Sequence, residues 1–433
     1  MTRSILLIAV IALAFRLMFV VIFPGPNYFE GISGPYLEVA QNIIDGRGAV
    51  LRVDVARVGD VSKWEYRSFI DRPLGYVFLV LVPMVFTSSP VGVQVLHSIL
   101  SALSVLILFF VGREIFGERT AWLGALLYAI WPLSARFEIA VLPDGVMPFF
   151  ILATLWLVLR GIRGGTLWFG LAGLVCGAGM TMRPDIALLP FVLVAGLFFW
   201  MRVRTGALAL LVGVALVVGL HTVRNYEVTG KIAPLGLGNG ISMWEGISQF
   251  GDTLGTVYGD DKAAEREGYH SWAYPNGIER DRGRFKEAVK VISENPVWYA
   301  GVVAKRIPVL LTPSMNITPY PMVPMREFMR SSKNTLETYF LLNPLPVAIR
   351  LLVVLLQYLS FVLAAYALWI HLGNRLLWLP VAVIAYYVVI HIPTNTESRY
   401  FYPVIPLVLM LAASVFEKKT EFVSDMDAER WAR

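Results

Sequence analysis

The chain has 433 residues, of which 57% are hydrophobic and only 16% are charged, and its formal net charge is +6. Soluble domains are about one quarter charged, so this composition excludes an ordinary soluble domain and indicates a polytopic membrane protein. The only cysteine, Cys176, excludes an intramolecular disulfide, and the absence of a basic stripe with interleaved aromatic residues argues against a nucleic-acid partner.

Apolar stretches that are long enough, or nearly long enough, to cross a bilayer as helices recur along the chain. They are residues 5–23, 91–112, 120–135, 145–159, 166–182, 186–201, 206–220, 346–370, 376–393 and 400–416. The first stretch precedes Pro24-Gly25-Pro26 without a small-residue cleavage motif, so we expect a retained anchor rather than a signal peptide. We therefore predict an all-α membrane protein with about ten transmembrane helices, interfacial helices and extracytoplasmic loops.

Short basic turns between these stretches predict the topology. Lys and Arg are enriched in cytoplasmic loops, which places the turns around Arg113, Arg160, Arg202 and Arg375 in the cytoplasm. Residues 74–86 are apolar but short for a span, and a crossing there would move every later basic turn to the other side. We therefore expect a re-entrant or interfacial helix at 74–86 and both termini in the cytoplasm.

The predicted organisation alternates membrane and extracytoplasmic parts. These are residues 1–23 (first transmembrane helix), 24–90 (extracytoplasmic loop with interfacial helices), 91–224 (transmembrane core), 225–345 (second extracytoplasmic region with interfacial helices), 346–416 (C-terminal transmembrane helices) and 417–433 (cytoplasmic tail). Within the second region, the amphipathic pattern of residues 281–306 favours contact of Lys305 and Arg306 with lipid phosphates. Residues 236–277 are expected to form an ordered lid or acceptor-binding loop.

Charged residues gather at the ends of the apolar stretches, and the predicted topology places all of them on one side of the membrane. They are Glu30, Asp71 with Arg72, Arg136 with Glu138, Asp144, Arg183 with Asp185, Arg224, and Glu397 with Arg399. Ionisable residues at membrane depth are costly and usually face a water-filled functional cavity. Carboxylates and guanidinium groups that converge at one membrane face predict a site for an anionic, membrane-borne substrate.

Short motifs around these residues follow one another in a characteristic order. They are Glu30 ahead of Tyr36-x-x-x-Ala40, Arg72-Pro73-Leu74-Gly75-Tyr76, Gly112-Arg113-x-x-Phe116-Gly117, Pro143-Asp144, Arg183-Pro184, Arg224-Asn225-Tyr226 followed by Gly238-Asn239-Gly240 and Trp244-Glu245-Gly246, and Arg399-Tyr400 with Pro403 and Pro406. Together they resemble type C membrane glycosyltransferases, in the branch related to protein O-mannosyltransferases and lipid A aminoarabinose transferases. One departure concerns the acid, often an Asp-Glu pair, that many relatives carry nearer the tyrosine. Ile32 and Ser33 stand there, so Glu30 is the nearest substitute.

The resemblance implies a glycosyltransferase of the hexosyl- or pentosyltransferase class. Its donor would be a polyprenyl- or dolichyl-phosphate-linked sugar, and its acceptor a hydroxyl of a lipid, a glycan or a protein. It also implies a multi-pass protein of the cell (inner) membrane, surrounded by membrane lipids, with its active site facing the periplasm or the outside. No metal-ligand spacing is visible among the five histidines, so no metal or other cofactor is expected, although distant relatives bind a divalent ion.

Such a transfer needs a base for the acceptor proton and cations for the charge on the departing phosphate. Glu30 is the predicted base, and Asp144 is a second acid that orients the acceptor or Glu30, or that caps the following helix. Arg399 is the first choice for the donor phosphate. Other residues assigned to the site are Arg72, Arg183 and Arg224 for the same phosphate, and Tyr36, Glu397 and Trp244 for the acceptor or a lid.

Simpler interpretations stand beside these assignments. Interfacial arginines often extend to lipid headgroups, and Arg183 and Asp185 could pair only with each other. A transporter of a polyprenyl-linked glycolipid would also need an anion site, but transporters often show inverted repeats and midplane binding, and no repeat is visible here. A non-catalytic binder of the carrier lipid is the third alternative, because of the missing acidic pair.

Overall fold

The computed structural model describes residues 2–25, 30–250, 254, 260–313, 317, 328–329 and 335–417. Five of its helices are long and apolar enough to cross a membrane: Ser4–Ile22, Pro90–Ile115, Pro143–Gly164, Arg204–Thr229 and Pro344–Ile370. Shorter apolar helical segments cover Gly75–Thr87, Thr166–Met182, Pro184–Trp200, Arg375–His391 and Ser398–Ser414. The predicted all-α membrane class is confirmed, apart from one small β-hairpin.

The N-terminal half contains helices, short 3-10 turns and the hairpin. The elements are α1 (Thr2–Ile22), α2 (Glu30–Ile44), β1 (Val50–Asp54), β2 (Trp64–Ser68), α3 (Gly75–Thr87), α4 (Pro90–Ile115), α5 (Glu118–Ala129), α6 (Pro132–Glu138), η1 (Pro143–Val146), α7 (Met147–Gly164), α8 (Thr166–Met182), η2 (Pro184–Ile186), α9 (Leu189–Ala195), η3 (Gly196–Trp200) and α10 (Arg204–Thr229). Strands β1 and β2 pair antiparallel, with Val50 opposite Ser68.

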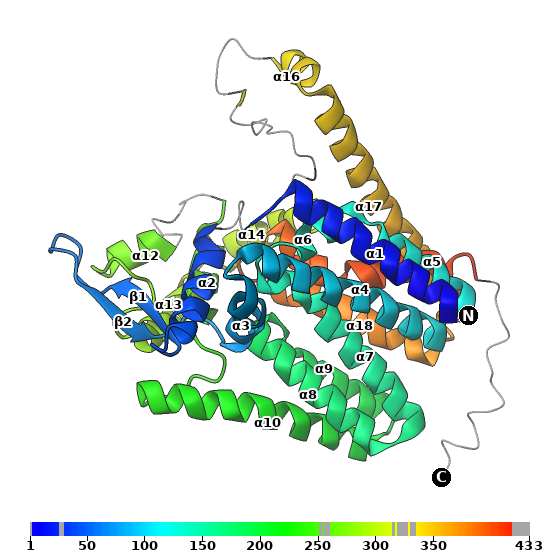
Figure 1. Ribbon diagram of the computed structural model, residues 1–433, viewed down its shortest axis with the longest axis horizontal. Helices are drawn as coiled ribbons and strands as arrows, with labels where there is room; N and C mark the ends of the chain where they lie inside the picture. Colours follow the sequence, from blue (N-terminus) through cyan, green and yellow to red (C-terminus); the bar gives the residue numbers. More distant parts are fainter. Residues whose placement is uncertain are drawn as a thin grey trace.

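The C-terminal half begins with helices of the second predicted extracytoplasmic region and returns to apolar helices. The elements are α11 (Asn239–Ser248), α12 (Asp260–Arg266), α13 (Gly277–Glu294), α14 (Pro296–Leu311), α16 (Leu336–Leu342), α17 (Pro344–Ile370), η4 (Arg375–Leu377), α18 (Trp378–His391), η5 (Ser398–Val404) and α19 (Ile405–Ser414). Figure 1 shows the hairpin, α2, α12 and α13 at one end of the molecule, whereas α17 extends away from the helical body with α16 at its far end.

One predicted span is wrong in its extent. The apolar stretch 120–135 is divided between α5 and α6, because α5 ends at Ala129 and a new helix begins at Pro132. Proline has no backbone N–H to donate to the preceding turn, and its ring is tolerated at the first position of a helix. After the break, α6 leads into η1, which carries Asp144 and packs against α4, α7 and η5.

A buried ion pair joins α1 to α6. Arg16 and Glu138 have side chains that are 0% and 1% exposed, and Arg16 Nη2 lies 3.1 Å from Glu138 Oε2. The Tyr128 hydroxyl donates to Glu138 Oε1 at 2.5 Å and the Ser101 hydroxyl donates to Glu138 Oε2, so partners on α1, α4 and α5 hold Glu138. Glu138 was expected at the aqueous site, but these contacts give it a structural role instead. Arg136 lies over the ring of Phe23 at 4.2 Å.

Helices α8 and α10 approach each other through glycines. A Cβ atom at Gly173 would lie 2.1 Å from the Leu210 carbonyl oxygen, and one at Gly213 would lie 2.4 Å from the Gly170 carbonyl oxygen. Between helices in a bilayer, small residues allow the close backbone packing that takes the place of a hydrophobic driving force. This packing fixes the position of the turn that follows α8.

Substitution of Gly173 by alanine is expected to destabilise the protein, because the new methyl group meets backbone atoms that cannot move aside. Overpacking of this kind costs about 1–3 kcal/mol. Gly170→Ala is the matched control on the same helix, since nothing lies within 4 Å of a Cβ atom at that position. Thermal unfolding in detergent should show a lower midpoint for Gly173→Ala only. Equal midpoints for the two variants would contradict the packing described here.

Candidate functional site

The candidate site lies where several helices begin or end. Arg183 follows α8, Asp144 lies in η1, Asp185 lies in η2, and Arg399 lies in η5. The local backbone follows from the sequence, because a residue before proline is pushed out of the helical region. Arg183 precedes Pro184 and has the extended angles φ −146° and ψ 123°, so α8 stops there and the guanidinium group leaves the helix axis.

Arg183 is the centre of a buried ionic cluster. Its Nη1 pairs with Asp144 Oδ1, and its Nε lies 3.1 Å from Asp185 Oδ2. His391 Nε2 lies 3.5 Å from the same Asp185 oxygen. The side chains of Arg183, Asp144 and Asp185 are 11%, 7% and 8% exposed. We name Asp144, Arg183, Asp185 and His391 the Arg183 cluster.

In the Arg183 cluster a single guanidinium faces two carboxylates. Burial disfavours the charged guanidinium, but the carboxylates of Asp144 and Asp185 outweigh this effect and raise the pKa of Arg183. Arg183 therefore stays protonated and holds both carboxylates as ion-pair partners. The pairing of Arg183 with Asp185 was one of the simpler interpretations. It is observed, but together with a second partner.

Arg399 borders the Arg183 cluster from η5. Its Nη2 lies 2.9 Å from Glu397 Oε1, and the Tyr400 hydroxyl donates to the same oxygen at 3.1 Å. Tyr400 also links the two arginines, because its ring lies 4.7 Å from the Arg183 guanidinium and 5.3 Å from that of Arg399. Arg399 interacts electrostatically with both Asp144 and Arg183. The Glu397 side chain is 44% exposed, so this ion pair reaches solvent.

Tyr36 and Arg72 form a second border. The Arg72 guanidinium lies 5.3 Å from the Tyr36 ring, and its Nη1 donates to the Ile32 carbonyl at 3.0 Å. Burial raises the pKa of the Tyr36 hydroxyl, while the charge of Arg72 opposes the rise. Asp144 and Arg183 also act electrostatically on Tyr36, which places α2 beside the Arg183 cluster.

Arg224 lies apart from this group. Its Nη1 donates to the Phe69 carbonyl at 2.6 Å and to Asn225 Oδ1 at 2.9 Å, so it supports the segment leading to Asp71 and Arg72. Burial raises the pKa of the Asp71 carboxyl, although the nearby Tyr274 and the charge of Arg72 oppose the rise. Among the described residues, no recorded hydrogen bond or ion pair joins Arg224 to the Arg183 cluster or to Arg399.

Trp244 is 3% exposed in α11 and lies beneath Arg266, whose guanidinium is 5.1 Å from the indole ring. A surface lid role for Trp244 does not fit this burial. The α11 N-terminus is capped by Asp281, whose Oδ1 accepts from the backbone N–H groups of Gly240 and Ile241 at 3.0 and 3.1 Å.

The predicted base, Glu30, is the first residue of α2, and its side chain lies outside the described residues.

The expected lipid contact of Arg306 is wrong. Arg306 is 0% exposed, and its guanidinium donates to the Ile392 carbonyl at 2.9 Å, to Gln249 Oε1 at 3.0 Å and to the Gly246 carbonyl. The amphipathic pattern suggested a surface position. Instead, the carbonyl groups at the ends of α11 and α18 need donors, and Arg306 supplies them.

Sequence reasoning gave no role to His391 and Tyr400. The available signal for His391 was its position at the end of an apolar stretch shortly before Glu397. The available signal for Tyr400 was the Arg399-Tyr400 motif. In the part of the chain that the structure describes, no group of three His, Cys, Asp or Glu side chains is placed to hold a metal ion. The arrangement is therefore one of arginines, carboxylates and aromatic rings, which can bind an oxyanion and orient a carboxylate.

The fold and the site define the chain as a polytopic membrane protein with a buried ionic site at the ends of apolar helices. Residues 71–222 match the family model for dolichyl-phosphate-mannose-protein mannosyltransferases. This segment contains Arg72, Asp144 and Arg183, whereas Tyr36, Glu397 and Arg399 lie outside it.

Two known proteins extend this comparison. The undecaprenyl phosphate-alpha-4-amino-4-deoxy-L-arabinose arabinosyl transferase of Pseudomonas aeruginosa (strain LESB58) is 31% identical over 156 residues, which is 33% of this chain and 28% of the relative's length. The crystal structure of the Archaeoglobus fulgidus oligosaccharyltransferase in the apo form has a TM-score of 0.53 at 12% identity, covering 96% of this chain and 50% of that one. The structural likeness concerns the fold. Together with the match over residues 71–222, it confirms the predicted resemblance to type C membrane glycosyltransferases.

Proposed function

We propose that this chain transfers a sugar from a polyprenyl-phosphate-linked donor to an acceptor hydroxyl at the extracytoplasmic face of the cell (inner) membrane. The observation that carries the proposal is the Arg183 cluster with Arg399 and Arg72 beside it, buried at the ends of apolar helices. The matched family and the Pseudomonas relative, whose name specifies an undecaprenyl-phosphate-linked sugar, support this donor class. The acceptor would be a lipid, a glycan or a protein.

The geometry favours different roles for the three arginines, Arg72, Arg183 and Arg399. Arg183 is already paired with two buried carboxylates, so little of its charge is left for a phosphate. Arg72 contacts a carbonyl and an aromatic ring among the described residues, and one partner of Arg399 is the half-exposed Glu397. We therefore assign the donor phosphate to Arg399 and Arg72, and assign to Arg183 the orientation of Asp144.

The reaction itself needs a carboxylate that is free to accept a proton. Asp144 is already engaged in an ion pair with Arg183, so its carboxylate is not free for this role. Glu30 is therefore retained as the base. The acceptor oxygen would bond to the anomeric carbon while the bond from that carbon to the phosphate oxygen breaks. The proton would pass to Glu30, and the lipid phosphate would leave with its negative charge beside Arg399.

The proposal is tested by the Arg399→Ala variant with a labelled polyprenyl-phosphate sugar and mixed acceptors, in phospholipid nanodiscs. Loss of one charge-assisted contact is worth about 1.5–3 kcal/mol, so the donor Kd should rise roughly 10- to 100-fold while the acceptor Kd stays unchanged. Arg160→Ala is the matched control, since Arg160 is an exposed arginine in a predicted cytoplasmic turn. Both Kd values are measured by titration of the labelled ligands.

Equal losses of donor and acceptor affinity in Arg399→Ala would contradict the phosphate assignment. Tight donor binding by the wild-type protein without transfer to any acceptor would instead favour a non-catalytic binder of the carrier lipid. ATP-independent movement of the donor across sealed vesicles, again without transfer, would favour a transporter.

A further inference from the structure

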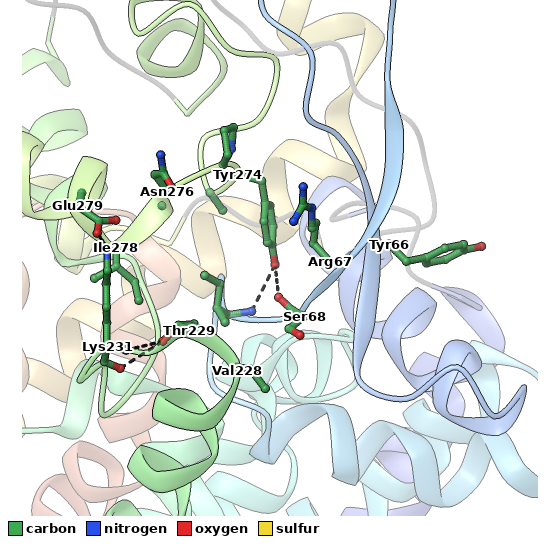
Figure 2. Close-up of a pocket in the computed structure, with 14 residues that line it drawn as sticks. Tyr66, Arg67, Ser68, Val228, Thr229, Lys231, Tyr274, Asn276, Ile278 and Glu279 are labelled. Atoms are coloured by element: carbon green, nitrogen blue, oxygen red, sulfur yellow. Dashed lines mark hydrogen bonds and ion pairs between the residues drawn. The ribbon is translucent and has the colours of Figure 1, made fainter.

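A cavity of about 470 Å³ lies apart from the Arg183 cluster. Three segments that are distant in the sequence form its walls: strand β2, the end of α10, and the segment that leads into α13. The residues used below are Arg67, Val228, Thr229, Lys231, Tyr274 and Glu279. Figure 2 shows Lys231 and Glu279 on one side of this cavity, Arg67 and Ser68 on the other, and Tyr274 between them.

Hydrogen bonds tie the walls of the cavity together. The Tyr274 hydroxyl donates to the Ser68 carbonyl at 2.8 Å and accepts from the Ile70 N–H at 3.3 Å, so the α13 segment is fixed to the hairpin (Figure 2). The Lys231 N–H donates to Thr229 Oγ1 at 3.1 Å, and the Lys231 ammonium pairs with Glu279. A cavity with walls fixed in this way is largely formed before a ligand arrives, as ligand-binding pockets usually are.

The charged side chains that line the cavity each pair with an oppositely charged group. Arg67 pairs with Glu65 at 2.5 Å, and Lys231 pairs with Glu279. Both cations therefore have a carboxylate partner, although Glu65 also pairs with Lys63 at 2.7 Å, and a phosphate would have to compete with a carboxylate for either one. The same groups offer hydrogen-bond donors and acceptors side by side, which is what a ligand with several hydroxyl groups requires. Tyr274 and Pro275 add apolar surface for the C–H faces of such a ligand.

We propose that this cavity binds a neutral, hydroxyl-rich group, such as one or two sugar units. Its volume lies within the range of roughly 300–1,000 Å³ that is usual for small-molecule sites. The cavity also adjoins the segment that carries Asp71 and Arg72, because Ile70 lines it. Where we identify the bound group as part of the acceptor, the inference rests on the proposed function; the binding of a neutral sugar does not.

Filling the cavity tests the inference. Val228 is 42% exposed at the end of α10 and lines the cavity, so Val228→Trp should place an indole ring in it without disturbing the core. Leu220→Trp is the matched control, because Leu220 is 75% exposed on the same helix and does not line the cavity. The probe is methyl β-maltoside, followed by saturation-transfer NMR on the full chain in phosphatidylcholine nanodiscs, which avoid sugar-headed detergents. We expect at least tenfold weaker binding for Val228→Trp and no change for Leu220→Trp.

A second pair of measurements defines the class of ligand. Glu279→Gln keeps the shape of the cavity but removes a strong acceptor, and it should weaken maltoside binding severalfold. Inorganic phosphate, added as a competitor, should leave maltoside binding unchanged. Displacement of the maltoside by phosphate, or undiminished binding to Val228→Trp, would overturn the inference. Since no donor is present, these outcomes are independent of whether the chain transfers a sugar.

Discussion

Replacement of Arg183 by glutamine is expected to cause the largest loss of stability of any single change in the site. The substitution leaves the carboxylates of Asp144 and Asp185 buried without their guanidinium partner. Removal of one partner from a buried ion pair costs about 3–5 kcal/mol. Thermal unfolding of the purified protein should show the loss as a lower midpoint, and transfer should fall to background because Asp144 is no longer oriented.

A triple variant separates these two effects. Asp144→Asn with Arg183→Gln and Asp185→Asn removes the charges of all three side chains, so much of the lost stability should return. Transfer should stay at background, since neither the ion pair nor the oriented carboxylate is restored. A triple variant that is no more stable than Arg183→Gln would show that unpaired charge is not the cause of the destabilisation.

The Glu30→Gln variant is expected to lose turnover without losing substrate binding. A positioned general base contributes roughly 10²–10⁴-fold to a rate, and glutamine cannot accept the acceptor proton. Single-turnover transfer with saturating donor and acceptor should therefore slow by about this factor. The two Kd values should match those of the wild-type protein, because glutamine is close to glutamate in size.

Glu38→Gln is the matched control for this experiment. Glu38 is an exposed acid on the same helix, α2, and its Oε1 accepts from the Arg52 N–H at 2.8 Å. This contact lies on the side of the β-hairpin, away from the proposed chemistry, so turnover should be unchanged. Undiminished turnover in Glu30→Gln would remove Glu30 as the base and leave the proton without a named acceptor.

Much of the fold could be predicted because long apolar stretches and prolines act locally. The stretch 91–112 lies inside α4, and 166–182 coincides with α8. Pro132 divides the stretch 120–135, a break that average hydropathy does not register. The β-hairpin was treated as part of a loop, because its strands are short and carry Arg52, Glu65 and Arg67. What stabilises it is partly tertiary: Leu51 and Val53 are buried in a core shared with α2 and α3.

The candidate site could be predicted only in part, for a related reason. Motifs show which residues carry charge, and Pro184 shows that α8 must end at Arg183. The pairing of Arg183 with Asp144 joins residues 39 positions apart, so it depends on how α7 and α8 pack. Arg224 and Trp244 lie away from the cluster because tertiary packing gives them other partners, the Phe69 carbonyl and Arg266. The roles assigned to the site residues stay predictions.

The burial of Arg306 has a mechanical consequence. One guanidinium group holds the carbonyls of Gly246 and Ile392, and Gln249 accepts from the Thr396 N–H at 3.3 Å. These contacts connect α11 and α14 to the short stretch that carries Glu397 and Arg399. A displacement of α11 would be passed on to the arginine that we assign to the lipid phosphate. Under the proposed function, if residues 236–277 bind the acceptor as predicted, acceptor binding and donor-phosphate binding would be coupled through the Arg306 side chain.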